Sequence, residues 1–192
     1  MIYGKRTALR PIETSDQGFV HDLNADPAVR GKVVGWDWPS SLTAQERWFS
    51  QQNAGTTHRW LVTTHENEPL GLTGIWDVDW HNSHALTALK LGGTAPMRGR
   101  GYGTDAIMAV MAFAFYDVGL TRLHGAILAD NEASRRAYVD KCGWSVEGVA
   151  RKHIWRHGSF VDLLYVGVLK SDFDNLADSA DYRRLIVEGH IG

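Results

Sequence analysis

Glycine and arginine with the spacing of an anion site stand together near the middle of the chain. Residues 97–105 read M-R-G-R-G-Y-G-T-D and directly precede an apolar segment, 106–118. Glycine lets the main chain come close to a ligand, and the free N–H groups at a helix start attract anionic oxygens. The stretch therefore predicts either a phosphate-binding turn or a plain tight turn between a strand and a helix. The glycines and arginines concerned are Gly99, Gly101, Gly103, Arg98 and Arg100.

A second group of polar residues has the spacing of a proton donor on a helix face. Residues 129–144 read A-D-N-E-A-S-R-R-A-Y-V-D-K-C-G-W. Ser134 and Tyr138 are four residues apart and share a helix face, with Asn131 at its start. A phenol, with a pKa of about 10, can protonate a departing thiolate, since a thiol has a pKa of about 8.5. The alternative is structural, with the serine hydroxyl bonded to the helix backbone and the tyrosine ring packed in the core.

Length, charge and cysteine content limit the class of protein. The 192 residues suit one domain, and 20 basic against 22 acidic residues give a formal charge of −2, which argues against general nucleic-acid binding. The first residues lack the apolar core of a signal peptide, and no apolar run has the roughly 20 residues of a membrane helix. We therefore expect a cytoplasmic protein without membrane contact. Cys142 is the single cysteine, so an intrachain disulfide and a cysteine-based metal site are excluded.

The residues of these two motifs must be positioned by strands and a few helices. A helix is expected after Thr14 with Phe19, Val20 and Leu23 inward, and a second around Trp48 and Phe49. A buried helix over 106–118 should cross over to a parallel strand, and a short helix should run from Asn131 to Cys142. The single domain is expected at 1–173, followed by a polar tail, 174–192, with a short helix near 182–187. That tail is interpreted as a docking or dimer segment, or as a frayed end. The expected strands are 6–12, 59–64, 70–80, 85–94, 122–129, 144–155 and 159–169.

Taken together in this order, the two motifs resemble the GNAT superfamily of acyl-CoA-dependent N-acyltransferases. Arg98 to Gly103 matches its Q/R-x-x-G-x-G/A motif. The second stretch is similar to its N-x-x-S-x-x-x-Y-x-K-x-G-F segment, with Trp144 for the usual Phe and one extra residue between Tyr138 and Lys141. The resemblance covers residues 6 to about 173. The stretches T-A-L-R-P-I-E-T-S-D, W-D-W-P-S-S and E-G-V-A-R-K-H resemble the branch of ribosomal-protein N-terminal acetyltransferases, RimJ/RimL-like.

The resemblance implies an α+β fold with a mixed, mostly antiparallel central sheet of about seven strands flanked by helices. It implies acetyl-CoA as co-substrate, no metal, and direct attack of a primary amine on the thioester. Asn131 would contact the pantetheine, and Tyr138, helped by Ser134, would protonate the thiolate. Main-chain groups around Leu91 to Gly93 would hold the pantetheine arm and acyl carbonyl, and the Gly92-Gly93 doublet fits either a strand bulge or the plain end of a strand. The implied donor-binding residues are Leu91, Gly92, Gly93, Arg98, Arg100, Gly101, Tyr102, Gly103, Thr104 and Asn131.

The acceptor side is less defined by sequence. An aromatic wall formed by Trp36, Trp38, Trp76 and Trp80 is expected to hold the amine, which is either a protein N-terminus or a small molecule. Residues 85–94 contain no acid, so the general base stays unassigned among nearby residues such as Asp77, Asp79 and His84.

Several alternatives remain open at this stage. A non-catalytic CoA-binding or regulatory module, a longer acyl donor and a homodimer all fit the sequence. A nucleotide-hydrolysing P-loop does not, because no G-K-[ST] follows the glycines. His81 and His84 lack the partners of a metal site, and Cys142 is expected to be a buried structural thiol.

Overall fold

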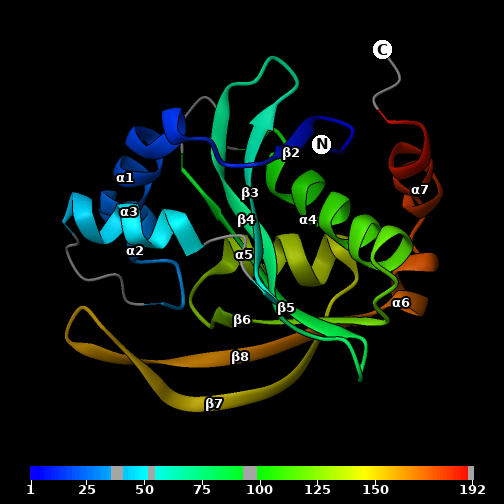
Figure 1. Ribbon diagram of the computed structural model, residues 1–192. Coiled ribbons are helices and arrows are strands. Elements are labelled where there is room, and N and C mark those ends of the chain that lie inside the picture. The colour runs from blue at the N-terminus through cyan, green and yellow to red at the C-terminus, as the bar shows by residue number, and fades with distance from the viewer. Residues whose placement is uncertain (36–40, 52–54, 93–98, 190–192) are drawn as a thin grey trace.

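Eight strands in one sheet form the centre of the molecule (Figure 1). The computed structural model describes residues 1–35, 41–51, 55–92 and 99–189. The sheet order is β1-β2-β3-β4-β5-β6-β8-β7, and every neighbouring pair is antiparallel except β5 and β6. The predicted α+β fold with a mixed, mostly antiparallel sheet is confirmed. The strands are β1 (Ile2–Tyr3), β2 (Thr7–Arg10), β3 (His58–Thr64), β4 (Pro69–Asp79), β5 (His84–Leu91), β6 (Arg122–Leu128), β7 (Ser145–Arg156) and β8 (Ser159–Leu169).

The strand count exceeds the expected seven by one, because β1 has no recognisable sequence pattern. A two-residue strand, Ile2–Tyr3, is too short to show the alternation of apolar and polar residues by which a strand is recognised. The parallel pair follows the prediction, since the long helix after β5 crosses over before β6 pairs beside it.

Helices cover both faces of the sheet (Figure 1). The α1, α2 and α3 helices lie on one face, and α4, α5, α6 and α7 lie on the other. The helices are α1 (Gln17–Ala25), α2 (Pro27–Arg30), α3 (Leu42–Gln51), α4 (Tyr102–Ala112), α5 (Glu132–Arg135), α6 (Lys170–Asp174) and α7 (Ser179–Glu188), with a 3-10 turn η1 (Thr14–Asp16) and π-helical segments η3 (Phe113–Asp117) and η4 (Arg136–Lys141).

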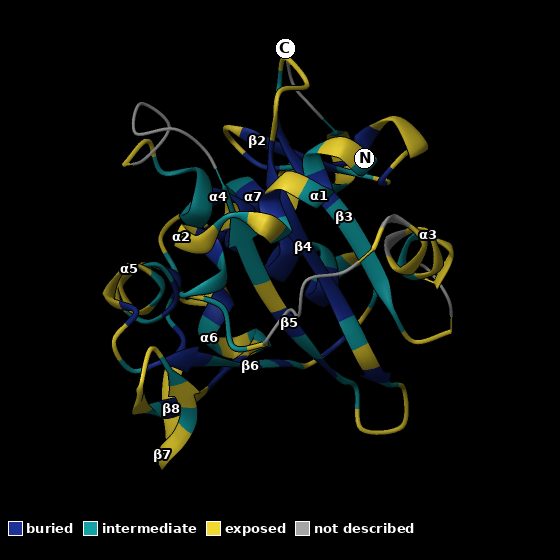
Figure 2. Ribbon diagram, turned by 90° about the vertical axis from the view of Figure 1, so that its left-hand side faces the viewer, coloured by how far each residue is buried: buried dark blue, intermediate teal, exposed yellow. Residues whose placement is uncertain are grey.

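Two groups of buried side chains hold these layers together. The larger group surrounds α4, whose residues 105–112 are all buried, whereas its first turn is intermediate and teal in Figure 2. This agrees with its sequence, which is apolar nearly all round. The smaller group fixes α1 and α2 on the opposite face of the sheet, and so positions the loop that follows α2. It consists of Ile12, Val20, Leu23, Val29, Leu61 and Leu72.

The residues that follow position 173 pack against the rest of the molecule. Helix α7 contacts α4 and β1, and Tyr182 is 5% exposed. The Tyr182 hydroxyl donates a 2.6 Å hydrogen bond to the Asp105 carboxylate on α4. The short helix expected near 182–187 is therefore part of the core rather than a frayed tail. Within the described ranges, no helix is long and apolar enough to cross a membrane.

Candidate active site

The turn before α4 has the backbone conformation of an anion-binding helix start. Gly99 and Gly101 have φ angles of 79° and 84°, a region that residues with side chains rarely adopt. Gly101 is the N-cap of α4, and the first bond of the helix joins the Asp105 amide to the Gly101 carbonyl at 3.0 Å. The amides of residues 102–104 therefore precede the first helical bond and lie at the positive end of the helix dipole.

Most of the residues expected to bind pyrophosphate lie in or beside this turn. Arg100 precedes the N-cap and its side chain is exposed. Arg98, which belongs to the same expectation, and Gly93, which was expected beside the pantetheine arm, lie outside the described residues. The other members of the set, all at the start of α4, are Gly101, Tyr102, Gly103 and Thr104.

A gap opens in the sheet beside this turn, because β5 and β6 separate. Their parallel pairing covers residues 84–86 of β5 and 122–124 of β6. Beyond that point β6 continues to pair with β8 up to Leu128, while β5 continues beside β4 up to Leu91. The second half of β5 and the second half of β6 therefore diverge and leave their facing edges available to a ligand.

Of the Gly92-Gly93 doublet, for which the sequence left open a bulge or the end of the strand, only Gly92 lies within the described residues. The Gly92 amide bonds to the Leu70 carbonyl at 3.0 Å and so extends the regular ladder between β4 and β5. The irregularity in that ladder lies instead between Trp76 and Asp79, where Asp77 has a φ of 52°.

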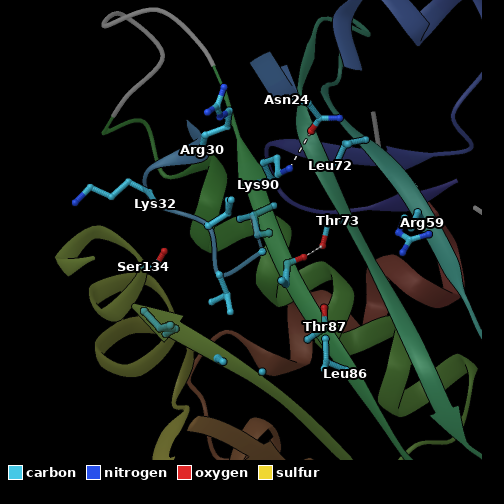
Figure 3. A pocket seen from close by; sticks show the side chains of 18 of the residues that line it. Asn24, Arg30, Lys32, Arg59, Leu72, Thr73, Leu86, Thr87, Lys90 and Ser134 are labelled. Atoms are coloured by element: carbon cyan, nitrogen blue, oxygen red, sulfur yellow. Dashed lines mark hydrogen bonds between the residues drawn. The ribbon is translucent and has the colours of Figure 1, made fainter. Parts of the chain in front are cut away.

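The gap leads into a cavity of about 900 Å³, the central cavity (Figure 3). It is enclosed by α1, the loop after α2, α3, the central strands and the α5–η4 helix. Its described lining comprises His21, Asn24, Ala25, Arg30, Lys32, Val33, Val34, Gly35, Ala44, Trp48, Arg59, Leu72, Thr73, Trp76, Leu86, Thr87, Ala88, Leu89, Lys90, Gly125, Ala126, Ile127, Asn131, Ser134, Tyr138 and Val166.

Asn131, Ser134 and Tyr138, which the sequence placed on one helix face, all line this cavity. Asn131 caps α5 by accepting the Ser134 amide at 3.2 Å, and its side-chain amide donates to the Lys32 carbonyl at 2.9 Å. Asn131 therefore fastens the loop after α2 over the cavity. Ser134 is partly buried and Tyr138 is buried.

The Tyr138 phenol sits in a site that keeps it protonated. Its ring packs edge-on against Trp144, with the ring centroids 5.0 Å apart. Burial raises the pKa of Tyr138 well above the usual value for a phenol, the electrostatic interaction with Cys142 raises it further, and a backbone hydrogen bond from Leu89 opposes the rise. A group with a raised pKa is an acid throughout the working range of an enzyme, so this phenol can donate a proton but does not act as a base.

The π-helical segment explains the extra residue between Tyr138 and Lys141. The regular turn of α5 ends at Arg135, and η4 runs from Arg136 to Lys141. A π-helical turn accommodates one residue more than an α-helical turn. The insertion is therefore absorbed locally, and Ser134 and Tyr138 still reach the same cavity.

The aromatic wall differs in part from the expectation. Trp76 lines the central cavity, whereas Trp80 follows β4 with 59% exposure and is absent from the described lining. The second aromatic side chain is Trp48 from α3, which sequence patterns do not assign to the site. The Arg59 guanidinium lies between them, with its central carbon 5.6 Å from the ring centroid of Trp48 and of Trp76. Trp36 and Trp38 lie outside the described residues.

The charges of the cavity are one-sided. Among the described residues that line it, none is an aspartate or glutamate and four are cationic, namely Arg30, Lys32, Arg59 and Lys90. Asp77, Asp79 and His84, the nearby candidates for a base, are not in that lining. Over the described ranges, no cluster of three or more histidine, cysteine or acidic residues has the arrangement of a metal site.

A single arginine from the β7–β8 hairpin fixes one wall of the cavity. Arg156 donates hydrogen bonds to three successive carbonyls, of Val33, Val34 and Gly35, at 3.1, 3.1 and 2.9 Å. These three residues belong to the cavity lining. No sequence pattern indicates this contact, which joins segments more than 120 residues apart.

A glycine-rich turn at a helix start, a parallel strand pair that separates beside it and a buried phenol across the gap define a class, the acyl-CoA-dependent N-acyltransferases. The family model described as "Acetyltransferase (GNAT) domain" matches residues 6–145. The chain belongs to this family, and the protein is an acetyl-CoA-dependent N-acetyltransferase.

Relatives and solved structures agree with the family. The chain is 23% identical over 171 residues to the SPbeta prophage-derived uncharacterized N-acetyltransferase YokL of Bacillus subtilis, covering 89% of this chain and 94% of that protein. It is 31% identical over 74 residues to the probable N-acetyltransferase YjcK of the same organism, covering 38% and 40%. The spermidine N-acetyltransferase of Vibrio cholerae, solved with CoA and spermine, superposes with a TM-score of 0.79 at 18% identity, over 88% of this chain and 98% of that one.

Proposed function

We propose that the protein is a RimJ/RimL-like enzyme that transfers the acetyl group of acetyl-CoA to a primary amine held in the central cavity. The pyrophosphate binds the amides of residues 100–104, with Arg98 and Arg100 nearby. The pantetheine arm lies in the gap between β5 and β6, against the main chain of residues 91–93 and beside Asn131. This placement puts the thioester next to Tyr138 and opens its other side to the acceptor.

One observation carries the proposal: the buried phenol of Tyr138 lines the cavity where β5 and β6 separate. The amine nitrogen attacks the thioester carbonyl carbon, the carbon–sulfur bond breaks, and the sulfur takes the proton of Tyr138. Ser134, on the same helix face, assists by orienting the phenol. The proton lost by the amine returns to the phenol through water in the cavity, so the cycle closes without a metal.

The replacement Tyr138→Phe tests the role of the phenol. The phenylalanine ring keeps the packing on Trp144, so acetyl-CoA affinity measured by calorimetry should stay within about threefold. Turnover should fall by roughly 10²- to 10⁴-fold, the usual contribution of a positioned acid. Equal turnover in wild type and variant would refute the role of Tyr138. Absence of acetyl-CoA binding to the wild type would refute the donor site.

A polyamine, which the Vibrio cholerae structure contains, is not the acceptor that we propose for this chain. The described lining contains four cationic side chains and no carboxylate. Two like charges 4 Å apart repel by about 4 kcal/mol at the effective dielectric of a protein surface. A substrate with several positive charges is therefore disfavoured by the described part of the lining.

A further inference from the structure

We propose that His124 of β6 is the general base of the reaction and accepts, through a water molecule, the proton that the acceptor amine loses. The inference rests on the proposed function, because it adds a residue to the same reaction. It is carried by the place of His124 at the end of the gap, by a ring that the described part of the fold leaves unbonded, and by the charged groups around that ring.

His124 stands where β5 and β6 begin to separate. It is the last residue of β6 that pairs with β5, and its partner there is Leu86. A Cβ at the next residue, Gly125, would lie 2.8 Å from the Thr87 carbonyl oxygen, so the two strands are still close at this point and diverge beyond it. Leu86 and residues 125–127 line the central cavity. His124 is therefore the next residue outward from the lining, from which one water molecule can relay a proton.

The side chain of His124 lies on the acceptor side of the sheet. Residues that pair across neighbouring strands point to the same face, and Trp76, Leu86 and His124 form such a row over β4, β5 and β6. Trp76 and Leu86 both line the central cavity. The ring of Tyr138 instead packs against Trp144 in the core that surrounds α4. A thioester in the gap would therefore have the acid on one face of the sheet and the base on the other.

The His124 ring is available to exchange a proton. Over the described ranges its nitrogens make no hydrogen bond, and the ring lies edge-on to that of His84, with 5.3 Å between the centroids. The His84 ring is oriented by an acid, since its Nε2 lies 3.7 Å from a carboxylate oxygen of Asp79. An imidazole whose nitrogens are not used by the fold can take up and release a proton without breaking a structural bond.

Charged and titratable groups from four strands surround this ring. Burial lowers the pKa of His124, and the interactions with His84 of β5 and Arg122 of β6 lower it further. Glu147 of β7 and Asp77 of β4 oppose this change, and the β8 residue opposite His124 is a glycine. Arg122 donates a 2.6 Å hydrogen bond to Glu147, so these two charges largely offset each other. The imidazole is therefore neutral near pH 7 and can accept a proton, whereas Tyr138 can donate one.

The protons balance between these two residues. The neutral amine attacks the thioester carbon, a carbon–nitrogen bond forms, and the nitrogen becomes positively charged. His124 takes one proton from this nitrogen, the carbon–sulfur bond breaks, and the sulfur takes the proton of Tyr138. The imidazolium then passes its proton to the phenolate through water in the cavity, which restores both residues.

The test replaces His124 and offers an external base. Glycinamide, ethanolamine and the dipeptide alanylalanine serve as amine probes with acetyl-CoA, and transfer is followed by thiol release and product mass. With the best probe, His124→Gln and His124→Ala should both lower kcat/KM by roughly 10²- to 10⁴-fold, the contribution of a positioned base, while acetyl-CoA affinity measured by calorimetry stays within about threefold. Added imidazole should raise the rate of His124→Ala by about tenfold or more, because it can occupy the space that the ring has left.

The matched control is His153→Ala, an exposed histidine of β7. This variant should transfer acetyl groups at the wild-type rate and should not respond to imidazole. His124→Gln should not respond to imidazole either, because its side chain fills the same space. A structural role for His124 predicts instead that glutamine, a polar side chain of similar size, retains activity.

The pH dependence separates a base from a residue that only supports the fold. The ionisation of the amine cancels in the ratio of wild-type to His124→Gln kcat/KM. This ratio should be constant near pH 7 and above, and should fall as His124 becomes protonated below about pH 6.5. A ratio independent of pH, activity of His124→Gln within about threefold of the wild type, or no response of His124→Ala to imidazole would overturn the inference and leave the donor site intact. Acetyl-CoA binding by the wild type without transfer to any probe would refute the proposed function as well.

Discussion

Replacing Asp105 by asparagine should destabilise the fold without weakening the donor site. The buried carboxylate, 3% exposed, accepts five hydrogen bonds. They come from the amides of Lys5, Arg6 and Thr7 at 2.8, 3.0 and 2.9 Å, and from the hydroxyls of Thr7 and Tyr182, both at 2.6 Å. Asp105 therefore ties the first turn of α4 to the N-terminal segment and to α7.

The magnitude follows from the bonds that an amide can keep. The asparagine side chain loses least when its nitrogen takes the position of the oxygen that faces Tyr182, because the Tyr182 hydroxyl can accept a hydrogen bond. The Lys5 amide, which bonds the same oxygen, would then lose its acceptor, and this loss costs about 1 kcal/mol. The three bonds to the other oxygen would lose their charge assistance, at roughly 0.7 kcal/mol each. The sum is about 3 kcal/mol, or about 6–12 °C in Tm for a chain of this size. Tyr182→Phe, which removes one bond, should cost about 1 kcal/mol.

Urea unfolding followed by tryptophan fluorescence measures both variants. Acetyl-CoA affinity of the folded Asp105→Asn protein should be equal or higher, because a negative charge has left the helix start to which the pyrophosphate binds. This account of the carboxylate would be refuted if Asp105→Asn lowered the free energy of unfolding by less than about 1 kcal/mol, the contribution of one such hydrogen bond. It would also be refuted if Asp105→Asn destabilised the fold less than Tyr182→Phe does.

Three further predictions concern the cavity wall, the cysteine and the acid limit. Arg156→Met removes the bonds to the carbonyls of residues 33–35 and should raise the acceptor KM by about tenfold, as steady-state kinetics with saturating acetyl-CoA will measure. Cys142 is fully buried and burial raises its pKa to about 12, so it should resist iodoacetamide at about pH 8, and Cys142→Ala should retain acetyl transfer. The hydrogen bond from Arg10 lowers the pKa of Asp16, so this pair stabilises the fold above about pH 4 and the contribution disappears as the pH falls through the lowered value. Unfolding free energies between about pH 2 and 5 should depend less steeply on pH in Asp16→Asn.

The donor half of the site could be predicted because its residues are close together in the sequence. The backbone of the turn before α4 depends on Gly99 and Gly101, which the chain needs for their positive φ angles. Ser134 and Tyr138 are joined by a single stretch of helix, so their spacing alone brought them together. The family follows from these short-range features, and the sheet follows from the alternation of its longer strands.

The remaining elements depend on contacts that no local pattern reveals. Tyr182 is buried because it binds Asp105, 77 residues earlier, so a polar segment that resembles a tail is part of the core. Glycine at residue 92 permits an irregular backbone but does not require one, and its amide continues the ladder to the Leu70 carbonyl. In β4, Asp77 adopts a positive φ angle although it is not a glycine, so its residue type does not indicate the irregularity there.

The acceptor half of the site combines both difficulties, because the residues that surround it come together only in three dimensions. Trp48, Arg59 and Trp76 belong to α3, β3 and β4, and each taken singly is an ordinary residue of an amphipathic helix or a strand. The strand register brings Arg59 and Trp76 to one face of the sheet, and the packing of α3 adds Trp48. In the proposed function, donor recognition depends on backbone amides, which other members of the family can also supply. Acceptor recognition depends on side chains, and substitutions among them can change the charge of the cavity without changing the fold, so relatives of the same architecture can differ in the amine that they acetylate.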